Sequence, residues 1–238
     1  MKKNNNLENA KILAVIPARG GSKSIKDKNI IKVKNRPLIE FTANAAKRSK
    51  YIDKVVVSTD DLKIKKISER LNLEIPFKRP KYLSTDRVTT HEVIKHAVNT
   101  YERIINHSFE IIVTLQPTSP LRTSKHIDES IEKFINNKIS DSLISVQEAP
   151  HNFIPDSIMK IDRNGYINNY KKNQKKLLRR QDKPKFYARN GPAICITKRK
   201  KLEKYLYGGK INYYIMDYFS SLDIDTYEDL ELLNKIIK

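Results

Sequence analysis

The chain of 238 residues is 39% hydrophobic and 31% charged, a composition typical of a water-soluble globular domain. No apolar run approaches the roughly 18 residues of a membrane helix, and no secretory segment follows the basic start. The only cysteine, Cys195, excludes an internal disulfide or a cysteine-rich zinc site. We therefore expect a cytoplasmic protein. The formal net charge of +20 is concentrated in residues 1–50 and 171–210, which would attract nucleic acid or a small phosphate-rich substrate, although lysine-rich helix surfaces in solvent give the same excess.

The first 150 residues alternate between short apolar runs, which predict buried strands, and amphipathic segments, which predict helices. This order predicts an α/β fold with a mostly parallel sheet covered on both faces, and such sheets bind ligands beyond the carboxyl ends of their strands. The expected strands are 11–16, 55–57, 109–115 and 142–146. The first expected helix covers 37–50, and the second begins after a cap at Asp60 or Asp61 and ends at about 71. The third covers 93–101 and is preceded by Thr89 and Thr90, of which Thr90 could be its cap. The fourth is capped by Ser124 and ends at about 137.

After Pro150 the pattern changes. Two short runs, 158–161 and 166–170, flank Asn164-Gly165, which is a strong signal for a β-hairpin. We therefore expect a single domain over 11–238, preceded by a flexible 1–10 and interrupted by a β-rich protrusion at about 150–190. The remaining elements are expected as a strand at 193–197, a helix at 198–206, a strand at 213–216 and a helix at 226–237.

The loop after the first strand, residues 17–29, is rich in glycine and cations. Gly20 and Gly21 let the backbone approach a ligand closely, and their amides could form an anion-binding nest. Arg19, Lys23 and Lys28 could surround a triphosphate, although the spacing is not that of a Walker A loop. A surface turn without a ligand is the alternative.

Three further segments carry candidate chemistry. Residues 116–122 form a proline-stiffened loop whose amide, hydroxyls and guanidinium suit a hydroxyl-rich acid, or which bonds only to its own backbone. Residues 179–191 could be an RNA-binding arm, a sugar-acid site in which Arg180 pairs a carboxylate, or a solvated basic loop. Asp223 and Asp225 would share one face of a strand and could hold Mg²⁺. Asp225 could instead cap the last helix with Glu228, and both roles are compatible if the helix starts one residue later.

Six segments in chain order resemble the motifs of the acylneuraminate cytidylyltransferases, also called CMP-sialic acid synthetases. Each motif alone would be weak, but together they extend over about residues 12–230. The segments are Ile16-Pro-Ala-Arg-Gly-Gly-Ser-Lys23 with Lys28-Asn29, Ser58-Thr-Asp60, Arg79-Pro80 with Leu83-Ser-Thr-Asp86, Gln116–Arg122, Arg180-Gln181 with Arg189-Asn-Gly191, and Asp223-Ile-Asp225.

The resemblance implies a Rossmann-like, three-layer nucleotidyltransferase that joins CTP to an acidic nine-carbon sugar, giving a CMP-sugar and pyrophosphate. It implies Mg²⁺ on Asp223 and Asp225, and catalytic roles for these two residues, Lys28 and Arg19. The nucleotide residues would be Ala18, Arg19, Gly20, Gly21, Ser22, Lys23, Lys28, Asn29, Arg79 and Thr90. The sugar residues would be Gln116, Thr118, Ser119, Arg122, Arg180 and Gln181.

The resemblance also implies a homodimer formed through the protrusion, with neither nucleic acid nor a membrane as partner. No residue stands out as a dedicated general base, and nothing in the sequence selects N-acetylneuraminate, legionaminate or pseudaminate. Two alternatives stay open. One is a different sugar-acid or sugar-phosphate nucleotidyltransferase, and the other is a basic nucleic-acid-binding protein, for which no recognised motif is present.

Overall fold

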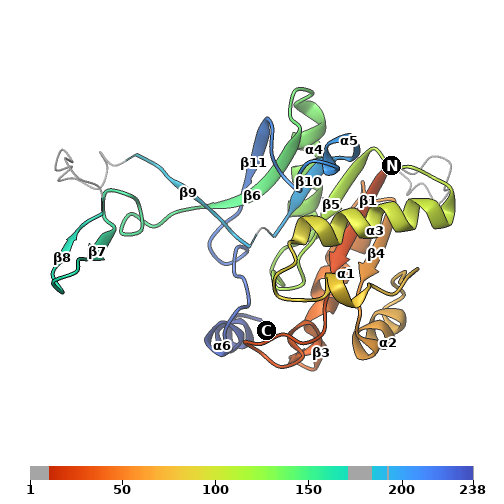
Figure 1. Cartoon of the computed structure of the whole chain (residues 1–238), viewed down its shortest axis with the longest axis horizontal. Helices are drawn as coiled ribbons and strands as arrows, with labels where there is room; N and C mark the ends of the chain where they lie inside the picture. The colour runs from red at the N-terminus through yellow and green to blue at the C-terminus, as the bar shows by residue number, and fades with distance from the viewer. Residues whose placement is uncertain (1–10, 171–183, 192, 238) are drawn as a thin grey trace.

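The computed structural model describes residues 11–170, 184–191 and 193–237. Its centre is a seven-stranded sheet with helices on both faces, as expected for an α/β fold (Figure 1). The six strands along the main path of the sheet are, in order, β11 (Ile211–Ile215), β6 (Ser142–Glu148), β10 (Cys195–Lys198), β5 (Ile111–Thr114), β1 (Ile12–Pro17) and β4 (Lys54–Ser58). The seventh strand, β9 (Tyr187–Arg189), pairs with β6.

Five of these seven strands run in the same direction. Strand β1 lies between two parallel neighbours, with Ala14 opposite Val55 of β4 and Val113 of β5. Strand β10 is antiparallel to both β5 and β6, and β9 is antiparallel to β6. The sheet is therefore mainly parallel, as predicted. The reversed strand β9 lies at the end of the segment expected to protrude, and the reversed strand β10 follows it.

The alternation of side chains along β1 explains why both faces of the sheet are covered. Ala14 and Ile16 pack in one apolar cluster, and Leu13 and Val15 pack in another on the opposite face. The first cluster includes residues of α1 (Leu38–Arg48) and α4 (Ser124–Asn136), and the second includes residues of α3 (Thr90–Ile105). The other helices are α2 (Leu62–Arg70), the short α5 (Arg199–Leu202) and α6 (Tyr227–Ile236).

The helix boundaries confirm some predictions and correct others. Asp61 caps α2, because its side chain accepts hydrogen bonds from the amides of Lys63 and Ile64. Thr89 caps α3, and α4 is capped by Thr123 instead of Ser124. The helix expected over 198–206 is only the single turn of α5.

The carboxyl-terminal helix corrects a prediction that matters for the site. Thr226 caps α6 and forms a capping box with Asp229, so neither Asp225 nor Glu228 is used as a cap. Residues 222–225 also form no strand, which differs from the expected strand geometry of the two aspartates. Asp225 is therefore available for another partner.

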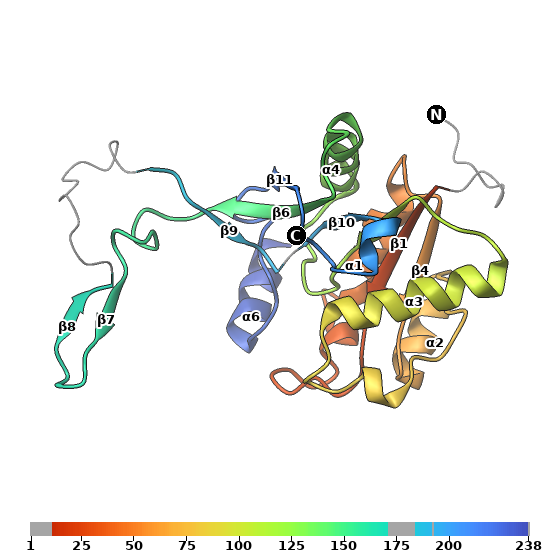
Figure 2. The same cartoon turned by 45° about the horizontal axis from the view of Figure 1, so that its top comes forward.

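Two small hairpins complete the chain. Strands β2 (Lys32–Val33) and β3 (Arg36–Pro37) form a tight hairpin that sequence reasoning missed. Strands β7 (Met159–Ile161) and β8 (Ile167–Asn169) confirm the hairpin predicted at Asn164-Gly165, and they project far from the rest of the molecule (Figure 2). Among the described residues, no helix is long and apolar enough to cross a membrane.

Candidate active site

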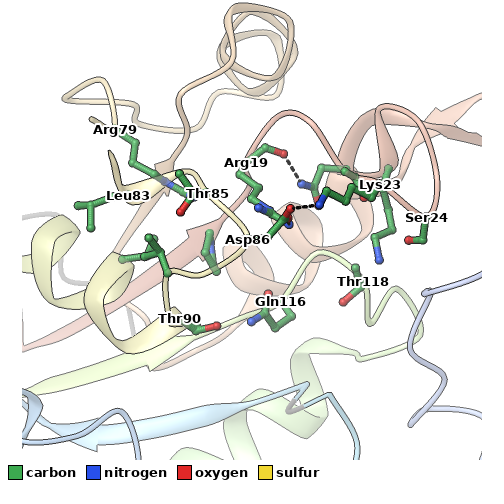
Figure 3. Close-up of a pocket in the computed structure, with 16 residues that line it drawn as sticks. Arg19, Lys23, Ser24, Arg79, Leu83, Thr85, Asp86, Thr90, Gln116 and Thr118 are labelled. Atoms are coloured by element: carbon green, nitrogen blue, oxygen red, sulfur yellow. Dashed lines mark hydrogen bonds and ion pairs between the residues drawn. The ribbon is translucent and has the colours of Figure 1, made fainter. Parts of the chain in front are cut away.

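A cavity of about 430 Å³ opens at the carboxyl ends of β1 and β5 (Figure 3). This is the edge at which parallel α/β sheets bind ligands, and the volume suits a small molecule. Arg19, Asp86 and Lys23 gather on one side, and Thr90, Gln116 and Thr118 face them. The full lining is Pro17, Arg19, Ser22, Lys23, Ser24, Lys28, Asn29, Arg79, Leu83, Thr85, Asp86, Val88, Thr90, Val93, Gln116 and Thr118.

The two ends of the chain meet at this cavity through Lys28. Its Nζ lies 2.8 Å from Oδ1 of Asp225 and donates to the carbonyl of Ile224 at 3.0 Å. The Lys28 side chain is only 13% exposed, whereas that of Asp225 is 69% exposed. The first loop and the segment of Asp225 are therefore in contact, although 197 positions separate them. Neither Asp223 nor Asp225 lines the main cavity, and Asp223 lines a second cavity together with Asn190 and Gly191.

The loop over residues 17–29 is fixed by one internal hydrogen bond and by apolar packing against the carboxyl-terminal segment. The Asn29 side-chain amide donates to the carbonyl of Arg19 at 2.9 Å, and Ile25 is fully buried in a third apolar cluster with Ile224 and Leu233. This cluster joins the loop to α6. The cationic side chains of the loop are thus presented to the cavity by a fixed backbone.

The glycines of this loop are placed differently from the expectation. The Gly20 amide donates to Oδ1 of Asp60 at 3.1 Å, so it is already engaged by a carboxylate. Gly20 and Gly21 line a neighbouring open groove together with Asp60 and Asp61, and neither lines the main cavity. Ala18 is fully buried. The structure therefore brings the charged side chains of the loop to the cavity, but not its glycines.

A carboxylate occupies the space between two of the cations. Asp86 Oδ1 lies 2.5 Å from Arg19 Nη2, and Asp86 Oδ2 lies 2.6 Å from Lys23 Nζ. Hydrogen bonds from Lys23 and Arg19 lower the pKa of the Asp86 carboxyl. A polyphosphate that used both cations would have to displace Asp86, because like charges repel at this distance.

Arg79 and Thr90 both line the cavity, as expected of nucleotide residues. The Arg79 guanidinium is buried and donates to the hydroxyl and to the carbonyl of Ser58. Burial lowers its pKa to about 10, while the charge of Asp60 acts in the opposite direction. Thr90 is not the helix cap, because Thr89 fills that position, and its hydroxyl group lies at the cavity (Figure 3).

The loop after β5 separates into residues that reach the cavity and residues that do not. Gln116 and Thr118 line it, whereas Ser119 is buried and its hydroxyl has no partner among residues 11–170, 184–191 and 193–237. Arg122 is buried and donates to the carbonyls of Gln116 at 3.0 Å and Ala193 at 2.8 Å. Burial lowers the pKa of Arg122 to about 9. Arg122 braces this loop from the core, which differs from the predicted contact with the sugar.

Asp223 has a buried carboxylate oxygen, Oδ1, that has no hydrogen-bond partner among the described residues. Burial raises the pKa of its carboxyl, a hydrogen bond from the Thr118 side chain acts in the opposite direction, and the charge of Asp225 raises the pKa further. The adjacent Ile224 amide donates to the carbonyl of Thr118 at 2.8 Å, which fixes this segment beside the cavity loop. Among the described residues, no cluster of three or more potential metal ligands occurs. Mg²⁺ needs only one or two carboxylates when substrate phosphates and waters complete its shell, so the pair of aspartates fits this ion.

The remaining predicted sugar residues, Arg180 and Gln181, lie outside the described residues. The structure adds cavity residues that sequence reasoning did not select: Pro17, Ser24, Leu83, Thr85, Asp86, Val88 and Val93. Thr85 and Asp86 belong to one of the motifs quoted above, so the sequence pointed to this segment. It did not show that their side chains face the cavity.

Comparison with known proteins shows the family to which the whole chain is related. The family model described as cytidylyltransferase matches residues 13–238. An N-acylneuraminate cytidylyltransferase of Escherichia coli is 34% identical over 93% of this chain, which spans about half (51%) of that relative's length. A pseudaminic acid cytidylyltransferase of Campylobacter jejuni is 31% identical, with 96% of this chain and 97% of the relative covered.

Among solved structures, the CTP complex of CMP:2-keto-3-deoxy-manno-octonic acid synthetase superposes with a TM-score of 0.70. The match covers 95% of this chain and 98% of that one, at 16% sequence identity. At that identity the likeness shows a shared fold, which is a nucleotidyltransferase fold.

Proposed function

Because the chain belongs to the cytidylyltransferase family, we propose that it transfers the CMP group of CTP to a nonulosonic acid and releases pyrophosphate. Relatives named for N-acylneuraminate and pseudaminic acid support this sugar class. The single observation that carries the proposal is the contact of Lys28, a cavity residue, with Asp225, which brings the cationic loop next to the segment of the two aspartates.

In the proposed reaction, the anomeric hydroxyl of the sugar attacks the α-phosphorus of CTP. An oxygen–phosphorus bond forms, the bond to the β-phosphate oxygen breaks, and pyrophosphate leaves with both electrons of that bond. The hydroxyl proton passes to solvent. Such transfers depend mostly on positioning and on charge stabilisation, because the transition state spreads negative charge over phosphate oxygens.

The cavity residues have distinct parts in this proposal. Lys28 is largely buried and fixed by two acceptors, so it can neutralise charge on the α-phosphate or the leaving group. Arg19, Ser22 and Lys23 would bind the triphosphate, with Asn29 near the nucleotide. Asp223 and Asp225 would hold Mg²⁺, which when bound would polarise the phosphate and lower the pKa of an attacking hydroxyl.

The cytosine would lie toward Arg79 and Thr90, and the sugar toward Gln116 and Thr118. Gln116 and Thr118 present an amide and a hydroxyl, which match the hydroxyl groups of the sugar. The resemblance adds Arg180 and Gln181 for the carboxylate. We place the reaction in the cytoplasm, where CTP is made.

We also propose that the active form is a homodimer held together by the protrusion. Both faces of the β7–β8 hairpin are exposed, and an isolated two-stranded hairpin is at best marginally stable in water. Its apolar side chains therefore need a second surface, and sedimentation is expected to give twice the mass of the chain. The exposed side chains are Ile158, Met159, Ile161, Tyr166, Ile167 and Tyr170.

A pyrophosphate-release assay tests the proposed function. Each of CTP, UTP, GTP and ATP is combined with N-acetylneuraminate, legionaminate, pseudaminate or 2-keto-3-deoxy-manno-octonate in the presence of Mg²⁺. We expect release with CTP and one of the nonulosonic acids only. Equal turnover of all four nucleotides, or release only with the octonate, would refute the proposal.

A further inference from the structure

The turn at Asn190 and Gly191 lies directly against the carboxylate of Asp223. A β-carbon on Gly191 would stand 2.8 Å from Asp223 Oδ2, 3.0 Å from Cγ and 3.2 Å from Oδ1. Contacts below 3.0 Å are not made by real β-carbons, and Gly191 also has a φ of +100°, which side chains disfavour. Both the space and the backbone therefore require glycine, and the whole carboxylate packs against its α-carbon.

Asn190 anchors this turn to the central sheet. It is 3% exposed, and its side-chain oxygen accepts from the Ser145 hydroxyl of β6 at 2.7 Å and from the Ala193 amide at 3.4 Å. Its side-chain amide donates to the Ser221 hydroxyl at 3.0 Å and to Met216 Sδ at 3.3 Å. A buried network satisfied in this way is rigid and specifies one geometry.

These contacts fix Asp223 from both directions along the chain. Ser221, two residues before it, is held by Asn190, and Ile224, one residue after it, is held by the Thr118 carbonyl. The carboxylate is confined, yet its buried Oδ1 has no hydrogen-bond partner in the part of the chain that the structure describes. An unpartnered buried oxygen is costly, so this arrangement is explained if a cation completes it.

We infer that Asn190 and Gly191 are positioning residues for the metal, acting through Asp223. Gly191 provides a surface without a β-carbon, and Asn190 holds that surface in place, so the carboxylate keeps the orientation in which it meets the cation. The inference rests on the proposed function for the identity of the cation as the one that accompanies CTP. Outer contacts of this kind change metal affinity by about 10- to 100-fold when they are removed.

The test is Gly191→Ala, with Mn²⁺ as the probe and electron paramagnetic resonance as the measurement, in the presence of CTP and without sugar. We expect at least about tenfold weaker Mn²⁺ binding, with CTP affinity in EDTA unchanged. Gly165→Ala is the matched control, because Gly165 also has a positive φ, +83°, but has no atom within 4 Å of its β-carbon position. Unchanged Mn²⁺ binding in Gly191→Ala would overturn the inference.

A double-variant cycle on thermal stability keeps the test decisive if Gly191→Ala folds poorly. In the Asp223→Ala background, the atoms that the new methyl group would meet are removed, so the loss of Tm caused by Gly191→Ala should shrink. An equal loss in both backgrounds would overturn the inference. Failure of the wild-type protein to bind CTP at all would instead refute the proposed function, so the two failures are distinguishable.

Discussion

Replacing Arg122 with methionine is expected to destabilise the fold, and to affect sugar binding only through the loop of Gln116 that its guanidinium braces. The guanidinium is 2% exposed and donates to the Gln116 carbonyl at 3.0 Å, the Ala193 carbonyl at 2.8 Å and the Thr42 hydroxyl at 2.6 Å. Methionine keeps an unbranched apolar stem but removes all of these donors. The Ala193 carbonyl then loses the Arg122 guanidinium as its hydrogen-bond donor. Ala193 lies just before β10, where the chain returns into the sheet.

The expected magnitude follows from these bonds. Hydrogen bonds to a charged group contribute roughly 1.5–3 kcal/mol each to the free energy of unfolding. The variant also avoids the desolvation cost of burying a charge, which recovers several kcal/mol. The net loss in the free energy of unfolding is therefore about 3 kcal/mol. In a chain of this size each kcal/mol shifts the Tm by about 2–4 °C, so we expect a decrease of roughly 6–12 °C.

Thermal unfolding followed by circular dichroism measures this loss, and steady-state kinetics measure the KM for each substrate. Arg70→Met is the control, because Arg70 is exposed in the last turn of α2, so its Tm should change little. An Arg122→Met variant with the wild-type Tm and a strongly raised sugar KM would refute the reasoning. That result would support the sugar contact implied by the resemblance.

Four further predictions concern the proposed reaction. Asp223→Ala and Asp225→Ala should each abolish Mg²⁺-dependent pyrophosphate release in a folded protein, and near-wild-type rates would remove the metal assignment. Lys28→Ala should mainly lower kcat, and an unchanged kcat would take it out of the catalytic set. Arg180→Ala should raise the KM for the sugar far more than that for CTP, whereas equal changes would argue against a sugar contact. Asp86→Asn should tighten CTP binding about threefold by calorimetry, since exposed ion pairs are weak competitors; weaker binding would mean that Asp86 holds the cations in place.

The sheet could be predicted because its strands are apolar on both faces. The run Ile12–Ile16 is buried throughout, and a continuous apolar run is the signature of a strand covered by helices on both sides. The direction of β10 was not predictable in the same way. An apolar run carries no information about orientation, and the reversal depends on how the chain returns from the protrusion.

The candidate site was predicted at the level of segments and less well at the level of side chains. Lys28 and Asp225 were both selected, and they meet because Ile25 and Ile224 pack in the same apolar cluster. The helix cap was ambiguous because Asp225 and Thr226 are adjacent residues that can both cap. Arg122 was selected for its chemistry, but its burial depends on contacts with distant Thr42 and Ala193, which local sequence does not reveal.

The central claim is that the first loop and the carboxyl-terminal aspartates form one nucleotide site. A crystal structure of the protein with CTP and Mg²⁺ tests this most directly. We predict that the triphosphate contacts Arg19 and Lys28, that Asp86 has left its position between Arg19 and Lys23, and that the metal lies on Asp223. Phosphates bound away from Lys28, with Asp223 distant from the metal, would contradict the account.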